Sequence, residues 1–178
     1  MPTHTTMTSR STGFTMLEVL IAIVILAFGL LGVAGLQAYA VANNQSAALR
    51  VAAAGLATDM VDRMKLNTPV FLDNLGYYNK PNSADYTTAV ASCTATAGCS
   101  VQERAQNDLY EWAQRVAASL PNGKGIVCVD STPNDGASQA APACDNTGIN
   151  LYVVKIWWRD DRLNVATTRP QFVWAFNP

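Results

Sequence analysis

The segment Val19–Leu36 (VLIAIVILAFGLLGVAGL) constrains this chain more than any other, because none of its 18 residues is charged. As a helix it would be about 27 Å long, at about 1.5 Å per residue. The hydrocarbon core of a bilayer is about 30 Å thick, so the segment predicts a single membrane span. A cleaved secretory signal is the alternative, but the apolar run continues into residues 37–49 without a turn or a cleavage pattern.

The charge content of the chain agrees with such a span. Only 14% of the 178 residues are charged, against about 25% in an average soluble domain. The deficit lies between Phe14 and Leu49, where 26 of 36 residues are apolar and Glu18 alone is charged. The rest has the composition of an ordinary secreted domain. The formal charge of -1 offers no basic surface to a phosphate backbone, so a nucleic-acid partner is not expected.

The flanks of the span predict its orientation. The 13 residues before Phe14 contain one basic residue, Arg10, and no acidic one. Basic residues near a span favour the cytoplasmic side. We therefore expect the N-terminus in the cytoplasm and everything after Leu49 outside it.

Glu18 breaks the apolar pattern at the edge of the span. A carboxylate in this position is costly unless a partner satisfies it or function requires it. Glu18 follows Phe14 by four residues, which puts both on one face of a helix. A cut between Gly13 and Phe14 would place the new α-amine one turn from this carboxylate, or from that of a neighbour. The alternative is that Glu18 lies at the interface and extends toward water.

The hexapeptide Gly13-Phe14-Thr15-Met16-Leu17-Glu18, followed directly by the span, resembles the processing motif of type IV prepilins. The resemblance implies that residues 1–13 are a leader. It also implies that a prepilin peptidase cuts between Gly13 and Phe14, and that the amine of Phe14 is methylated. Glu18 would then pair with the N-terminus of an adjacent subunit during assembly.

Later segments resemble the type IV pilus modification protein family, the PilV-like minor pilins: residues 29–37, 108–112, 120–121 and 152–160. This resemblance implies a type IV pilin-like fold and a non-enzymatic subunit. It would join other minor pilins and the major pilin, prime pilus assembly, and help a tip complex display an adhesin. Before assembly it would cross the inner membrane once, in contact with lipid and with its head in the periplasm; afterwards it would lie in the pilus.

Two other functions remain open. A type II secretion pseudopilin has the same N-terminal motif and span, and differs in the system whose partners it binds. A membrane-anchored periplasmic ligand-binding domain would keep the Gly13–Phe14 bond intact.

Two helices are predicted. Beyond the span, apolar residues recur every three or four positions at Leu49, Ala53, Leu56, Met60 and Met64, so we expect one helix over 14–66 with its transmembrane part at about 19–36. Ser100 to Glu103 forms a capping-box pattern, and the apolar period after it predicts a second helix over about 101–120. Residues 67–98 have no sustained period and are predicted to be a connecting loop.

The remaining segments predict strands. These are rich in β-branched and aromatic residues at about 125–130, 149–158, 163–168 and 171–176. In the second of them, alternation puts Tyr152, Val154, Ile156 and Trp158 on one face. The predicted fold class is α+β: a long N-terminal helix packed on a small antiparallel sheet, with a second short helix, and a globular head over 67–178.

The four cysteines all follow the span, on the side where disulfides persist. Four cysteines allow three pairings. Local pairing, Cys93 with Cys99 and Cys128 with Cys144, is favoured because each pair brackets a turn-rich loop. The spacings lack the paired C-x-x-C form of zinc sites, so a metal is not expected.

The chemistry of the chain does not indicate an enzyme. Its single histidine, His4, lies in the predicted leader, and no glycine-rich phosphate loop follows a strand. We therefore expect no catalytic residues and no cofactor. The four tryptophans are predicted to be core and sheet-face residues: Trp112, Trp157, Trp158 and Trp174. Of the adjacent pair, one must face away from the other, to be covered by a loop, buried in a subunit contact or exposed.

Overall fold

The computed structural model of the chain describes residues 13–67, 75–95, 98–147, 151–159 and 172–177. The chain divides into two compact units, residues 1–43 and 44–178. The division falls inside the first helix, whereas the sequence suggests a head that begins after that helix. The physical reason is that the C-terminal half of the helix contributes side chains to the core of the second unit.

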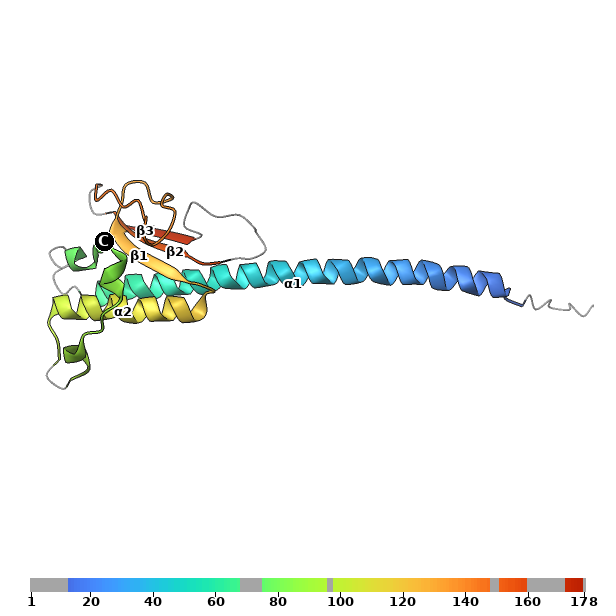
Figure 1. The fold of residues 1–178 in the computed structure, drawn as a ribbon, viewed down its shortest axis with the longest axis horizontal. Helices are drawn as coiled ribbons and strands as arrows, with labels where there is room; N and C mark the ends of the chain where they lie inside the picture. Colours follow the sequence, from blue (N-terminus) through green and yellow to red (C-terminus); the bar gives the residue numbers. More distant parts are fainter. Residues whose placement is uncertain (1–12, 68–74, 96–97, 148–150, 160–171, 178) are drawn as a thin grey trace, which may run out of the picture. The chain divides into compact units, whose positions relative to one another are not determined.

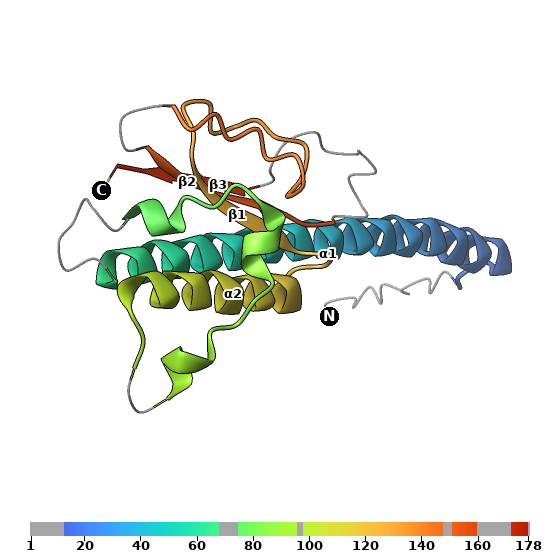
Figure 2. The same ribbon diagram turned by 60° about the vertical axis from the view of Figure 1, so that its left-hand side comes forward.

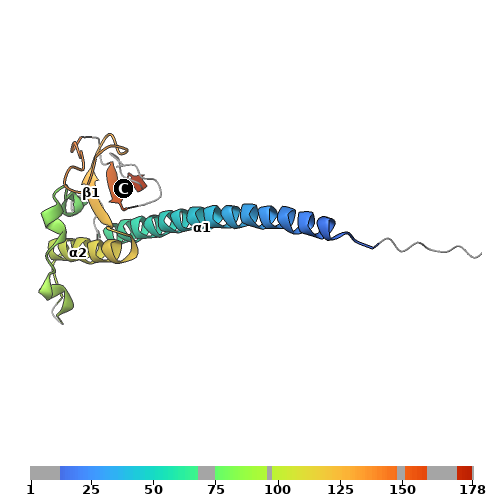
Figure 3. The ribbon, with the colours of Figure 1, turned by 45° about the vertical axis from the view of Figure 1, so that its right-hand side comes forward.

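Helix α1 runs without interruption from Met16 to Leu66, as Figures 1 and 3 show. Its buried residues recur at helical spacing, so that they form one stripe: Ala53, Ala57, Met60, Val61 and Met64. The helix ends before Asn67, whose side-chain amide donates to the carbonyl of Val101 at 2.9 Å. The second half of α1 therefore has one face in the core of the second unit.

Helix α2 (Val101–Ser119) lies antiparallel to this half of α1, because Val101 contacts Asn67 at the end of α1 and Trp112 contacts Leu56 earlier in it. It begins with the predicted capping box, in which Ser100 and Glu103 satisfy each other's backbone amides. The indole nitrogen of Trp112 donates to the carbonyl of Leu56 at 2.8 Å, which fixes the two helices to each other. The apolar face of α2 is completely buried: Ala105, Leu109, Trp112 and Val116.

A three-stranded antiparallel sheet completes the core, in the order β1-β2-β3. The strands are β1 (Lys124–Val129), β2 (Tyr152–Trp157) and β3 (Phe172–Phe176). Ile126 pairs with Lys155, and Val154 pairs with Trp174. The predicted strand at 163–168 lies outside the described residues. A long helix, a small antiparallel sheet and a second helix together confirm the predicted α+β fold.

Strand β2 is buried along its whole length, rather than on one face as its alternation alone suggests. One face of the sheet packs on the helices, because Gly125 of β1 lies against the ring of Trp112. Residues 130–147, which we call the strap, cover the other face: Trp157 donates to the carbonyl of Gly136 at 3.2 Å. Figures 1 and 2 show the sheet between the strap, in orange, and the helices.

The outer edge of β1 is occupied by residues 79–86. The amide of Lys80 donates to the carbonyl of Val127 at 2.9 Å, and the Tyr86 hydroxyl accepts from the amide of Val127 at 2.6 Å. Residues 67–98 were predicted to be a connecting loop with little regular structure, and their described part contains three short 3₁₀ helices: η1 (Leu75–Tyr78), η2 (Ser83–Tyr86) and η3 (Ala91–Thr94). These single turns were not predicted individually, because local caps and long-range contacts fix them without a hydrophobic period.

Three of the four tryptophans lie in the core. Trp112 is completely buried, and Trp157 and Trp158 are 7% and 6% exposed. Of the possibilities for the adjacent pair, the structure has Trp157 under the strap. Trp174, on β3, is 40% exposed.

We predict that Gly125→Val destabilises the second unit. A Cβ at this position would lie 2.2 Å from Cη2 of Trp112, and that ring cannot retreat because its nitrogen is bonded to α1. Overpacking of this kind costs about 1 to 3 kcal/mol. Urea unfolding of the full chain in detergent, followed by tryptophan fluorescence, measures the loss. Gly55→Ala is the control, because a Cβ there meets nothing within 4 Å and should leave stability unchanged or slightly raised.

We predict a pH-dependent contribution from the capping box of α2. Hydrogen bonds from the backbone and the hydroxyl of Ser100 hold the pKa of Glu103 below its usual value. Because the folded-state pKa is lowered, the carboxylate stabilises the fold above the pKa of unfolded glutamate, and this stabilisation is lost as the pH falls through the folded-state pKa. Glu103→Gln should therefore lower the urea midpoint at neutral pH, and this deficit should shrink at acidic pH, as the pH falls through the folded-state pKa of Glu103. An equal loss of the urea midpoint at neutral and at acidic pH would contradict this prediction.

Candidate functional site

The N-terminal motif lies at the start of α1. Gly13, Phe14 and Thr15 precede the helix and are exposed. Thr15 occupies the N-cap position: its hydroxyl oxygen accepts from the amide of Glu18 at 3.3 Å. The bond between Gly13 and Phe14 is therefore outside helical structure, which is the backbone state that a protease requires.

Glu18 lies in the first turn of α1. A carboxylate there interacts favourably with the positive end of the helix dipole. The sequence places Phe14 and Glu18 on one helix face, but the helix begins only at Met16, so Phe14 lies before the helix. The reason is that the Thr15 cap starts the helix one residue after itself.

The helix that follows the motif has the properties of a membrane span. Every residue from 13 to 41 is exposed, including large apolar side chains on all sides of the helix. An 18-residue window of α1 reaches a mean hydropathy of 2.9. Apolar surface of this extent requires lipid or protein around it.

The second unit has an ion-pair cluster where α1 meets α2. The guanidinium of Arg63 contacts Asp108 at 2.8 Å, Glu111 at 3.1 Å and Asp59 at 3.2 Å. The Tyr78 hydroxyl donates to Asp108 at 2.8 Å. Burial raises the pKa of Asp108, against the opposing effect of its hydrogen bonds from Tyr78 and Arg63. Each carboxylate of this cluster has a cationic partner, so the arrangement connects the helices rather than offering a reactive group.

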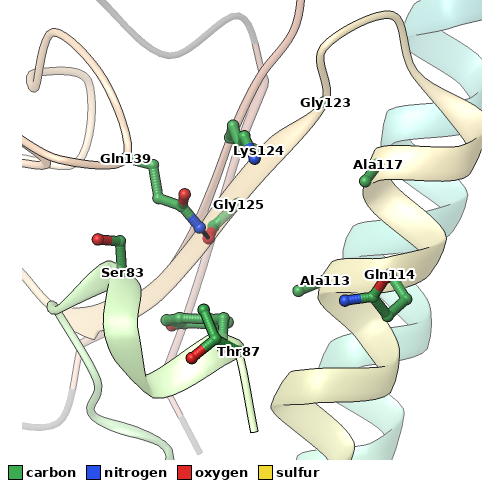
Figure 4. Close-up of a pocket in the computed structure, with 10 residues that line it drawn as sticks. Ser83, Thr87, Ala113, Gln114, Ala117, Gly123, Lys124, Gly125 and Gln139 are labelled. Carbon is green, nitrogen blue, oxygen red and sulfur yellow. Dashed lines mark hydrogen bonds between the residues drawn. The ribbon is translucent and has the colours of Figure 1, made fainter.

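A surface pocket of about 270 Å³ lies between η2, α2 and the start of β1 (Figure 4). Ala113 and Ala117 of α2 form one side, and Ser83 and Thr87 form the other. The Gln139 amide points toward Gly125 and donates to its carbonyl at 3.0 Å. The lining groups are hydroxyls, amides and one exposed ammonium, that of Lys124. The pocket can hold a small polar molecule, but its lining contains no nucleophile beside a general base.

The predicted site residues occupy separate places in the fold. Gly13, Phe14 and Glu18 lie together at the start of α1. Cys93 is joined to Cys99 before α2, and Cys128 of β1 is joined to Cys144 of the strap. His4 lies outside the described residues. Within the described part of the chain, no group of three or more metal-ligating side chains is close enough to hold an ion.

Two features of the structure were not predicted from the sequence. The Thr15 cap has a readable signal, because Thr15-Met16-Leu17-Glu18 matches the capping-box pattern. Lys155 is completely buried beside Asp130, although it lies in a strand whose alternation suggests a solvent-facing position. Its burial depends on the distant strap, so the local sequence carries no signal for it.

Two family models match the chain. The model of the prokaryotic N-terminal methylation motif matches residues 8–34, and the model of type IV pilin Tt1218 matches residues 35–110. No curated protein and no solved structure matches the chain. The two matched stretches adjoin, so the similarity to type IV pilins and their N-terminal motif extends over the motif, the span, the second half of α1 and the first half of α2.

The matches confirm the predicted resemblance at the level of a type IV pilin with a prepilin-type motif. The long apolar helix agrees with a pilin that is anchored in the membrane and later lies in the pilus. The pilin match indicates a structural subunit, and the methylation motif implies processing by prepilin peptidase and pilin partners. The matches do not reach the finer distinction between classes of pilin.

Proposed function

We propose that the chain is a minor pilin of a type IV pilus, which helps to prime assembly and joins the tip complex that displays an adhesin. The observation that carries the pilin part is the register of four features: the residues before Gly13, the Gly13–Phe14 bond, Glu18 and the span. Each falls where a prepilin needs it, and the methylation-motif match over residues 8–34 includes the last five residues before Gly13, the bond, Glu18 and most of the span. The minor-pilin part is supported by the sequence resemblance of residues 108–112 and 152–160 to modification-type minor pilins.

The proposal places residues 1–13 in the cytoplasm as the leader and the head in the periplasm. Prepilin peptidase cuts between Gly13 and Phe14 and methylates the amine of Phe14. The exposed, non-helical backbone at this bond supports that assignment. The two disulfides agree with a head in an oxidising compartment. After assembly, Glu18 pairs with the N-terminal amine of an adjacent subunit.

A second candidate is a membrane-anchored ligand-binding domain, which the polar pocket beside Lys124 and Gln139 favours. In that case the Gly13–Phe14 bond would remain intact. The N-terminus of the mature protein therefore decides between the two functions.

We predict that mass spectrometry of the protein purified from its own membranes finds Phe14, carrying one additional methyl group, as the first residue. Gly13→Val should block this cut, because a branched side chain replaces the glycine hydrogen next to the bond. Thr12→Val, with the same new side chain one residue earlier, is the control and should be processed. Recovery of the intact chain from unaltered protein would refute the pilin proposal in favour of the ligand-binding domain.

We predict that Glu18→Ala leaves cleavage and membrane insertion intact but lowers incorporation into sheared pili by about tenfold or more, since a buried amine then lacks its partner. Thr15→Ala is the control: it removes the hydroxyl cap and keeps the carboxylate, so incorporation should change little. Immunoblots of sheared pili and membranes measure both.

The same sheared pili test the minor role. Quantitative mass spectrometry should find this chain at a few copies per filament, beside a much more abundant major pilin. A copy number equal to that of the bulk subunit would contradict the minor role. Absence from pili, together with association with a secretion complex, would instead indicate a pseudopilin.

A further inference from the structure

The strap, residues 130–147, is held on the sheet by a buried lysine. Lys155 is completely buried in the centre of β2. Its ammonium contacts the carboxylate of Asp130, which is itself completely buried, and that of Asp135 at 2.8 Å. It also donates to the carbonyls of Pro142 at 2.9 Å and Asp135 at 3.2 Å. One side chain thus holds the beginning, the middle and the far part of the strap.

This ammonium is fully satisfied. It has three protons and donates three hydrogen bonds, to the Asp135 carboxylate and to two carbonyls, and it forms an ion pair with Asp130 besides. A buried charge is tolerated only with such partners, and losing them leaves an uncompensated charge in the core. The ion pair and the hydrogen bonds of Lys155 therefore favour a strap that lies on the sheet whenever β2 is formed.

Other contacts of the strap do not involve its disulfide. Gln139 donates to the carbonyl of Gly125 at 3.0 Å, and the amide of Asn146 donates to the carbonyl of Val129 at 3.1 Å. Gly136, with φ of +94°, allows the strap to fold back on itself, because a Cβ there would lie 2.2 Å from the carbonyl oxygen of Pro142. Ser138 and Ala141 pair in the turn between them, and this fold-back brings Asp135 and Pro142 to the same ammonium.

Cys128 and Cys144 both lie two residues from a residue that faces or contacts Lys155. Ile126 is directly opposite Lys155, and Cys128 lies two residues further along β1, on the same face of the sheet. Cys144 lies two residues after Pro142, whose carbonyl the ammonium holds. A strap that is docked on Lys155 therefore already has Cys144 beside Cys128.

We propose that Lys155 is a positioning residue for the Cys128–Cys144 disulfide: it docks the strap on the sheet before oxidation and so selects this pairing among the three that four cysteines allow. Docking replaces a search by a flexible loop with two thiols held together, which raises their effective concentration. The disulfide then closes a structure that exists without it.

The first experiment measures strap docking without the disulfide. In the full chain in detergent, with Cys128→Ala and Cys144→Ala together, hydrogen exchange of strap peptides should stay within about threefold of the unaltered protein. Adding Lys155→Met should accelerate the exchange of these peptides by about tenfold or more, because the strap then loses its contacts with the ammonium. Adding Lys124→Met instead is the control, because Lys124 is an exposed lysine on the neighbouring strand. Equal, fast exchange with and without Lys155 would overturn the proposal.

The second experiment measures the pairing itself. Non-reducing peptide mapping of Lys155→Met, produced with all four cysteines, should find mixed pairs between Cys93 or Cys99 and the other two. The Lys124→Met control should have the local pairs alone. If Lys155→Met fails to fold, Asp135→Ala removes one exposed anchor of the strap and should show a smaller rise in mixed pairs. Only local pairs in both Lys155→Met and Asp135→Ala would overturn the proposal.

Discussion

Helix α1 is continuous but lies in two different surroundings, lipid along its first half and a protein core along its second. The rest of the structure depends on how its side chains suit each of them. The backbone of α1 satisfies its own hydrogen bonds, so it can pass through lipid and through a protein core alike. Residues 16–41 are exposed on every side, whereas Ala53, Met60 and Met64 are completely buried. Trp112, the ion pairs of Arg63 and the sheet are all assembled on that second half. The head is therefore built on part of the element that anchors it.

A three-stranded sheet supplies too little cover for its own central strand. The helices cover one face of β2, and the strap covers the other with a buried ion pair rather than with apolar side chains alone. The free edge of β1 is blocked by Lys80 and Tyr86, which use its backbone groups. Blocking an edge in this way prevents strand addition by another copy. In the described residues, the cover on the second face of β2 and the block on the edge of β1 thus come from segments without regular secondary structure of their own or with single turns.

The sequence predicted those parts of the fold that have a hydrophobic period or a recognisable motif. The stripe through Met60 and Met64, the capping box at Ser100 and the strand around Val154 each have a period or a motif, and the structure contains all three. It did not predict the 3₁₀ helices or the burial of Lys155, because these depend on contacts between residues 20 or more positions apart. At the candidate site, the motif was readable because its residues are consecutive. The helix start at Met16 was missed because Thr15 was not interpreted as a cap.

The cap bears on the chemistry that the motif is proposed to undergo. Thr15 fixes the first turn of α1, so Glu18 is the third residue of the helix whatever precedes Gly13. A cut after Gly13 would leave a cationic amine near the positive end of the helix dipole, which is unfavourable by itself. Glu18 lies at the same end and offsets it. A carboxylate at this point therefore satisfies an amine, its own or that of a neighbour, at the end of a span where neither charge is otherwise tolerated. Under the proposed cleavage, such a pair would account for the position of Glu18, the only charged residue within residues 14–49, in the first turn of α1.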